Sequence, residues 1–156
     1  MFKRATPLPE TPLFSDLPVR TITCSAANIQ IAVHIHGDIA DDVAPIVCLP
    51  GYVRNISDFA GLPAAINRLP DTGFAFILID LPGRGRSAYL GKGARYSTLA
   101  DADCVLDVMA ALDVPRAVLA GEGHGGQVAM VIAARQPLAV AGTILVDSGP
   151  VTDPRG

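Results

Sequence analysis

Several features that would point directly to a function are missing from this sequence. Lys and Arg number 12 in 156 residues and form no cluster, and the net charge is −3, so we expect no nucleic-acid partner. No apolar run approaches the length that spans a bilayer. The first residues carry Pro7, Pro9, Pro12 and Pro18 in place of the apolar core of a signal peptide. We therefore expect no membrane contact and a cytoplasmic location.

Paired cysteines are also missing. Cys24, Cys48 and Cys104 are odd in number and far apart, and no C-x-x-C occurs, so neither a disulfide framework nor a thiolate metal site is indicated. Cys48 belongs to the apolar run 46–49, where a thiol acts as a small hydrophobic group. We expect no metal and no cofactor.

The composition that remains is that of a globular protein, with 50% hydrophobic and 17% charged residues. Residues 1–18 form a proline-rich N-terminal arm, and residues 19–156 form one domain.

The domain opens with two strands, Val19–Ser25 and Ile29–His36. In the second strand isoleucine and valine alternate with more polar residues, which predicts an antiparallel hairpin with one buried and one wetter face. His34 and His36 fall on the wetter face, where we interpret them as polar surface and not as metal ligands.

Beyond Pro45 the pattern changes to short apolar runs without alternation, which is typical of strands covered on both faces. These runs are Ile46–Leu49, Phe74–Ile79, Ala117–Ala120 and Thr143–Val146.

Helical patterns lie between these strands. Leu62, Ile66 and Leu69 share one face with Pro63 in the first turn, Thr98 and Asp101 have capping-box spacing, and 127–134 is apolar almost all round. Alternating strands and helices predict an α/β fold with a mostly parallel sheet.

The loops after three of these strands carry the most specific signal, because ligands of open α/β sheets bind at the carboxyl ends of strands. The loops are 49–52 (L-P-G-Y), 80–87 (D-L-P-G-R-G-R-S) and 121–126 (G-E-G-H-G-G). In this order they resemble the oxyanion loop, the D-x-x-G-x-G-x-S turn and the nucleophile elbow of the α/β-hydrolase family, in its esterase-like branch. The resemblance covers about residues 19–150. It implies an α/β-hydrolase-type sheet with an N-terminal antiparallel hairpin, truncated after the sixth strand.

The resemblance also assigns roles to residues of these loops. The backbone N–H groups of Tyr52 and His124 take the place of the oxyanion hole. The sharp turns require small residues, which are Gly51, Gly83, Gly85, Gly121, Gly125 and Gly126.

Two departures from the family pattern weigh against turnover. Gly123 stands where G-x-S-x-G has its nucleophilic serine, so no acyl intermediate can form there. The family's general-base histidine follows the last of eight strands, whereas this sequence ends at Gly156, just beyond the sixth. Asp147, which closes the sixth strand, is a candidate acid without a base. Arg84 and Arg86 are interpreted as exposed turn residues, and Asp41 and Asp42 as solvated loop charges.

The same glycines also fit a second pattern. Gly121, Gly123 and Gly126 form a G-x-G-x-x-G between a strand and a helix, and Asp147 falls near the offset of a ribose-binding carboxylate. An NAD(P)-binding Rossmann-like module is therefore an alternative, and so is a non-catalytic binding or interaction fragment.

The expected function is that of a protein resembling carboxylic-ester hydrolases, with little or no turnover. The expected partners are a small ester-like ligand and, through the apolar edge of the sixth strand, a second copy or a complementing C-terminal chain.

Overall fold

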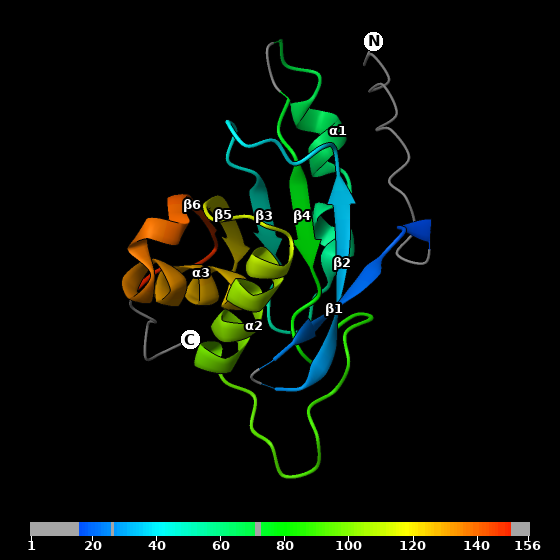
Figure 1. Cartoon of the computed structure of the whole chain (residues 1–156), viewed down its shortest axis with the longest axis vertical. Helices are drawn as coiled ribbons and strands as arrows, with labels where there is room; N and C mark the ends of the chain where they lie inside the picture. The colour runs from blue at the N-terminus through cyan, green and yellow to red at the C-terminus, as the bar shows by residue number, and fades with distance from the viewer. Residues whose placement is uncertain (1–15, 26, 71–72, 151–156) are drawn as a thin grey trace, which may run out of the picture.

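Six strands form one mixed sheet in the order β1-β2-β4-β3-β5-β6 in the computed structural model, which describes residues 16–25, 27–70 and 73–150 (Figure 1). β2 pairs antiparallel with both β1 and β4, and β4, β3, β5 and β6 run parallel. The predicted α/β class, with an antiparallel hairpin before a parallel set, is confirmed. The strands are β1 (Arg20–Cys24), β2 (Ile29–His36), β3 (Ile46–Leu49), β4 (Phe76–Ile79), β5 (Ala117–Glu122) and β6 (Val140–Val146).

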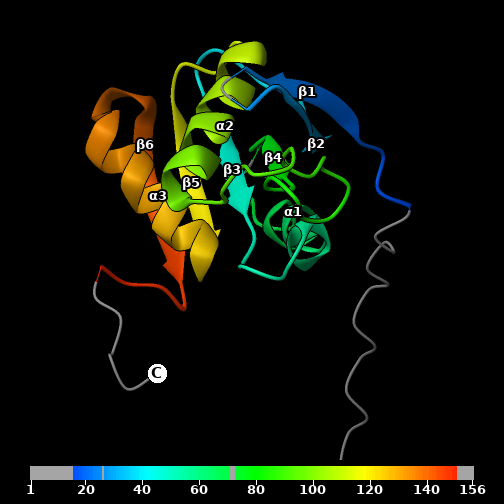
Figure 2. The same ribbon diagram turned by 90° about the horizontal axis from the view of Figure 1, so that it is seen from below.

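Helices cover both faces of this sheet. The long helices α2 (Thr98–Ala111) and α3 (His124–Arg135) lie on one face, and the short α1 (Leu62–Ile66) lies on the other (Figure 2). Two 3-10 helices, η2 (Ile56–Phe59) and η3 (Pro137–Ala139), complete the connections.

The central strands divide their side chains between two hydrophobic clusters. Val47 and Leu49 of β3 pack with residues of α2 and α3, whereas Ile46 and Cys48 pack with η2 and α1. This follows from the period of two along a strand, and it explains why β3 and β4 are apolar at every position.

Two strands are covered differently from the prediction. In β2, Ala32 and His34 are buried although they fall on the face expected to be wetter. Ser87 accepts the Ala32 N–H at 2.8 Å, and the His34 ring lies 2.7 Å from the Pro18 carbonyl. The chain around Pro18 therefore lies against His34 on that face, and Ser87 hydrogen-bonds the backbone of β2. Conversely, β6 is exposed along most of its length, because it is an edge strand.

The helix boundaries also differ from the sequence patterns. Ser97 and not Thr98 caps α2, since its side chain accepts the Ala100 N–H, and Asp101 is free for other contacts. Helix α3 begins at His124, three residues before the apolar run. Leu69 lies outside α1 and is exposed.

The prediction that no disulfide is present is wrong. Cys24 at the end of β1 and Cys104 in α2 are bonded, with Cα atoms 5.0 Å apart and a sequence separation of 80. The bond joins the N-terminal hairpin to α2, and the Ser25 N–H donates to Asp107 of the same helix at 2.7 Å. Sequence spacing could not reveal a pair that only the packing of β1 against α2 brings together.

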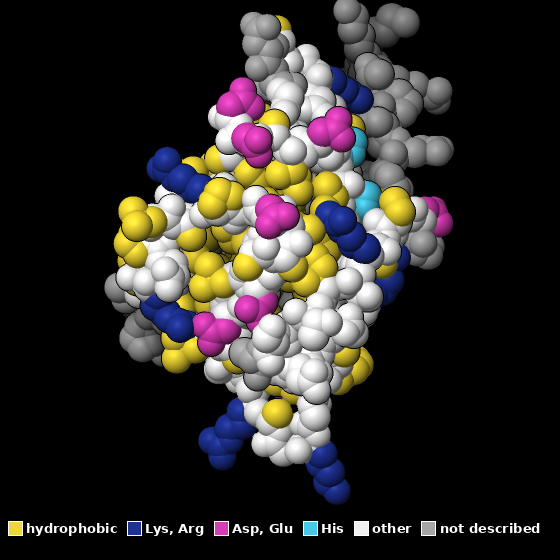
Figure 3. Space-filling view, in the orientation of Figure 1, with side chains coloured by type: hydrophobic (Ala, Val, Ile, Leu, Met, Phe, Trp, Pro, Cys, Tyr) yellow, Lys and Arg dark blue, Asp and Glu magenta, His cyan; other side chains and the backbone are white. Residues whose placement is uncertain are grey.

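Most of the predicted arm, residues 1–15, lies outside the described part of the chain. Within the described part, helices of the length and apolarity needed to cross a bilayer are lacking. On the face seen in Figure 3, Lys and Arg side chains are scattered and do not gather in a patch.

Candidate active site at the carboxyl edge of the sheet

The oxyanion loop and the elbow lie side by side because β3 and β5 are neighbours. Leu49 pairs with Gly121 in the parallel register. Gly51 lies two residues after Leu49, and Gly123 lies two residues after Gly121. The strand register therefore brings these two loops together at the carboxyl end of the sheet.

Gly123 joins β5 directly to α3 and has φ 50° and ψ −112°. This conformation is strained for any residue with a side chain, and it is typical of the elbow that exposes a nucleophile between strand and helix. A Cβ at position 123 would meet no atom within 4 Å. The site has room for a side chain, and glycine leaves it without a nucleophilic atom.

The glycines around position 123 are required by close backbone contacts. A Cβ on Gly121 would collide with the backbone of Gly125, and a Cβ on Gly125 would collide with Leu49. A Cβ on Gly126 would run into Ser148, which places the segment after β6 against the start of α3. These steric contacts explain why the three positions hold glycine.

The backbone N–H groups of Tyr52 and His124 have no acceptor among the described residues. His124 is the first residue of α3, where an N–H has no partner within the helix. Gly51 leaves space for this loop, since a Cβ there would lie 3.2 Å from Arg54. The loops after β3 and β5 therefore each present one N–H donor without an acceptor in the described part of the chain.

The turn after β4 is held by Asp80. Its buried carboxylate accepts the Ile56 N–H at 2.9 Å and the Arg86 N–H at 2.9 Å. Gly85 has φ 54°, and a Cβ there would collide with this carboxylate. Burial raises the pKa of Asp80, and the two backbone N–H donors oppose that rise. The D-x-x-G-x-G-x-S motif is therefore a structural turn that fixes the loops on either side of the site.

Ser87 completes the same turn. Its hydroxyl donates to the Asp80 carbonyl and accepts the Ala32 N–H, so it ties the turn to β2. Gly83 has φ 71°, and a Cβ there would meet the ring of Tyr96 at 2.7 Å.

A buried polar cluster lies behind the oxyanion loop. Asp101 is 1% exposed, and its Oδ2 lies 2.7 Å from His124 Nε2 and 3.1 Å from Arg84 Nη1. Arg84 Nε also donates to the Tyr52 carbonyl at 2.7 Å. The Tyr52 and His124 rings meet edge to face, with centroids 5.8 Å apart.

This cluster corrects two sequence interpretations. Asp101 was predicted to cap α2, and Arg84 was predicted to be an exposed turn residue, yet Asp101 is buried, Arg84 is largely covered, and the two side chains contact each other. The spacing of Thr98 and Asp101 matched a capping box, so the contacts of Asp101 with Arg84 and His124 were not predicted. The position of Asp101 among the buried residues of α2 could have indicated a buried polar contact.

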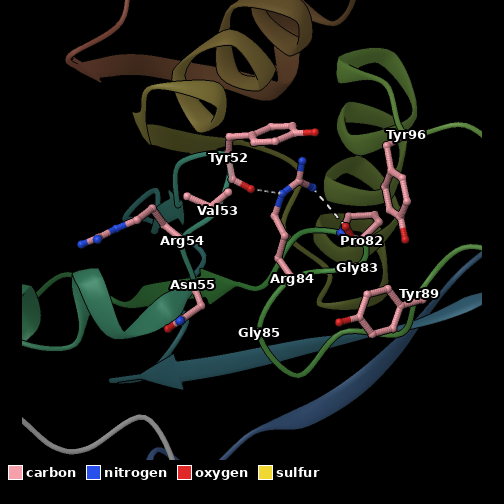
Figure 4. A pocket seen from close by; sticks show the side chains of 10 residues that line it. All are labelled: Tyr52, Val53, Arg54, Asn55, Pro82, Gly83, Arg84, Gly85, Tyr89 and Tyr96. Atoms are coloured by element: carbon pink, nitrogen blue, oxygen red, sulfur yellow. Dashed lines mark hydrogen bonds between the residues drawn. The ribbon is translucent and has the colours of Figure 1, made fainter.

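A cavity of about 380 Å³ opens between the oxyanion loop and the turn after β4 (Figure 4). Figure 4 shows Arg84 between Tyr52 and Pro82, with Tyr89 and Tyr96 on the side of the cavity away from Tyr52. Gly123 and His124 are not among its lining residues. The cavity therefore lies beside the oxyanion donors, and Tyr52 and Arg84 connect the two.

The remaining candidates lie farther apart. His34 and His36 are on β2, which β4 and β3 separate from β5, so they do not reach the elbow. Asp147 follows β6, whose Val146 carbonyl accepts the Gly123 N–H at 2.9 Å. Asp147 is thus near the elbow in the chain path, with φ 48°.

Cys48, the cysteine outside the disulfide, is buried in β3. Burial raises the pKa of its thiol to about 12, which leaves it unreactive. In the described ranges, three or more His, Cys, Asp or Glu side chains do not gather into a group that could hold a metal ion.

Comparison with known proteins agrees with this geometry. The chain is 38% identical over 91 residues to the AB hydrolase superfamily protein YisY of Bacillus subtilis, covering 58% of this chain and 32% of that one. An α/β-hydrolase structure from Novosphingobium aromaticivorans superposes with a TM-score of 0.77 at 28% identity, over 89% of this chain and 47% of that one. Est816, described as an N-acyl homoserine lactone degrading enzyme, superposes with a TM-score of 0.67 at 31% identity, over 83% and 46%.

The chain spans about a third of the length of the curated relatives it matches. A family model for the alpha/beta hydrolase fold matches residues 44–155, which include all three loops of the site. From the strand order, the elbow geometry and this match, we conclude that the chain belongs to the α/β-hydrolase fold family.

Proposed function

We propose that this chain binds small ester-like ligands at the Tyr52–His124 donors and has little or no turnover of its own. The observation that carries the proposal is Gly123, which occupies the elbow in nucleophile-like backbone geometry but has no side chain. Without an oxygen or sulfur atom there, no covalent bond to an acyl group can form. The N–H donors and the adjacent cavity would remain as a binding site.

An ester-like ligand is supported by the site and by one relative. Free backbone N–H donors suit the oxygen of a polarised carbonyl. The cavity beside them has the tyrosines Tyr52, Tyr89 and Tyr96 for the apolar part of a ligand. Est816, whose described substrate contains a lactone, is 31% identical over the matched region.

Two measurements on the unmodified protein test this proposal. Hydrolysis of para-nitrophenyl butyrate should not exceed the buffer rate, and a fluorophosphonate probe should leave the protein unlabelled. A phosphonate monoester, which is a stable tetrahedral anion, should bind saturably in a calorimetric titration. Fast saturable hydrolysis would contradict the inactivity, and no binding of ester or phosphonate would contradict the ligand class.

The dinucleotide alternative gains little support from the fold. β5, which carries the G-x-G-x-x-G, follows a hairpin and two parallel strands, whereas a Rossmann domain usually opens with its fingerprint strand. The family match also includes these glycines. Saturable micromolar binding of NAD would restore this alternative.

We also propose that the edge of β6 pairs with another polypeptide. Ile144, Leu145 and Val146 are exposed on an edge strand, which is a template for strand addition. The two candidate partners are a complementing chain that continues the sheet and a second copy of this chain. Light scattering measures the molar mass of the protein in solution. Twice the mass of the chain for the purified protein would indicate a second copy, and a larger mass only for the protein isolated from its source would indicate a complementing chain.

The cytoplasmic location remains a proposal. The Cys24–Cys104 disulfide weighs against it, because such bonds are rare in reducing compartments.

A further inference from the structure

One side chain links the two loops that carry the proposed oxyanion donors, the first by direct contact and the second through Asp101. Arg84 donates from Nε to the Tyr52 carbonyl at 2.7 Å and from Nη1 to Asp101 Oδ2 at 3.1 Å. The same Oδ2 lies 2.7 Å from His124 Nε2. Three consecutive contacts therefore join residue 52 on the loop after β3 to residue 124 at the start of α3.

Arg84 is held tightly in this position. Its side chain is 10% exposed, Nη1 also donates to the Pro82 carbonyl at 3.0 Å, and the guanidinium carbon lies 5.2 Å from the centre of the Tyr52 ring. A planar guanidinium can serve several acceptors in fixed directions at once, which an ammonium group cannot. The turn that Asp80 fixes presents Arg84 to the oxyanion loop (Figure 4).

Asp101 is the link between Arg84 and His124. Its carboxylate is buried, Oδ2 receives both partners, and Oδ1 has no hydrogen-bond partner among the described residues. Burying a charge costs free energy that its contacts can fail to offset, so a buried ionic cluster is weak evidence for a stabilising role. A role in fixing geometry accounts for it better.

We infer that Arg84 is a positioning residue that fixes both backbone N–H donors, directly at Tyr52 and through Asp101 at His124. The inference rests on the proposed function, because it takes these two N–H groups as the ligand-binding donors. Arg84 holds Tyr52 by its carbonyl, and the N–H on the other side of that residue has no acceptor. Asp101 holds His124 by its ring, and the N–H of that residue is also without an acceptor.

The test uses NMR on the isotope-labelled full chain without ligand. In Arg84→Gln, backbone order parameters of both Tyr52 and His124 should fall from about 0.85 to below about 0.6. In Asp101→Asn, which leaves the contact between Arg84 and the Tyr52 carbonyl in place, only His124 should loosen. Compared with Arg84→Gln, Arg84→Lys should retain part of the backbone order at either Tyr52 or His124. Arg68→Gln, the same change at an exposed arginine, should alter neither.

A second readout is the affinity for the phosphonate monoester. It should fall about tenfold or more in Arg84→Gln, as expected for loss of a hydrogen bond to a charged group, and stay unchanged in Arg68→Gln. A folded Arg84→Gln protein with unchanged order and affinity would overturn the inference. If that variant does not fold, loosening of both residues or of neither in Asp101→Asn would overturn it.

The two proposals fail separately. If the wild type does not bind the phosphonate but the order parameters change as expected, the proposed function is wrong and the positioning by Arg84 stands. If the wild type binds and the order parameters do not change, the binding site stands and the positioning is wrong.

Discussion

The imidazole of His124 lies 2.7 Å from the buried carboxylate of Asp101, measured from Nε2 to Oδ2. The contact directs this ring nitrogen towards α2, and the ring packs edge to face against Tyr52. The histidine nearest the elbow in sequence is therefore engaged in the cluster that supports the oxyanion loop. With its Nε2 in contact with Asp101, His124 is not free to act as a general base for a nucleophile at position 123.

Replacing Gly123 with serine should give a folded protein without useful esterase activity. A Cβ fits at this position, so the expected cost is the strain of this backbone conformation, about 1–3 kcal/mol. No histidine of this chain is placed as a free general base for that hydroxyl, so para-nitrophenyl butyrate should be hydrolysed no faster than by Gly123→Ala, the matched control. Burst kinetics in the serine variant alone would show that a base is present.

Replacing Gly85 with alanine should destabilise the fold strongly. The new Cβ would collide with the Asp80 carboxylate in addition to its strained φ, and we expect a loss of about 2–4 kcal/mol in urea unfolding. Gly93→Ala is the matched control, because Gly93 has φ 86° but open space around it, and it should lose about 1 kcal/mol. Equal losses would remove the proposed role of the Asp80 contact.

Asp80 should make stability depend on pH. Because burial raises its pKa above the unfolded value of 3.8, the folded state binds more protons in the interval above that value. The contribution of this group to stability is therefore full below the unfolded pKa and is lost as the pH rises through the folded pKa. Between about pH 4 and pH 7, the free energy of unfolding of the wild type minus that of Asp80→Asn should fall as the pH rises. Chemical unfolding of both proteins across that range measures this difference, and a rise with pH would contradict the prediction.

Thiol counting should reveal the disulfide and the buried cysteine. The native oxidised protein should not react with a thiol reagent, because Cys24 and Cys104 are bonded and burial raises the pKa of Cys48. After unfolding without reductant, mass spectrometry should find alkylation at Cys48 alone, and after reduction at all three cysteines. Alkylation of Cys24 without reductant would contradict the bond.

Much of the fold could be predicted from the sequence because its signals are local. Alternation in 29–36 identified the hairpin, and the unbroken apolar runs at 46–49 and 74–79 identified strands covered on both faces. Details failed where the cover came from distant chain. The His34 ring, for example, contacts the Pro18 carbonyl, which no local pattern records.

The sequence by itself determined the three loops and the residue at the elbow, since a glycine in place of a serine removes the nucleophile in any conformation. Only the tertiary structure decided which side chains support those loops. Asp101, Arg84 and His124 meet because α2, the turn after β4 and the start of α3 converge at one edge of the sheet. Cys24 and Cys104 meet for the same kind of reason, as β1 packs against α2. Such contacts depend on how separate elements pack, and spacing along the chain does not encode them.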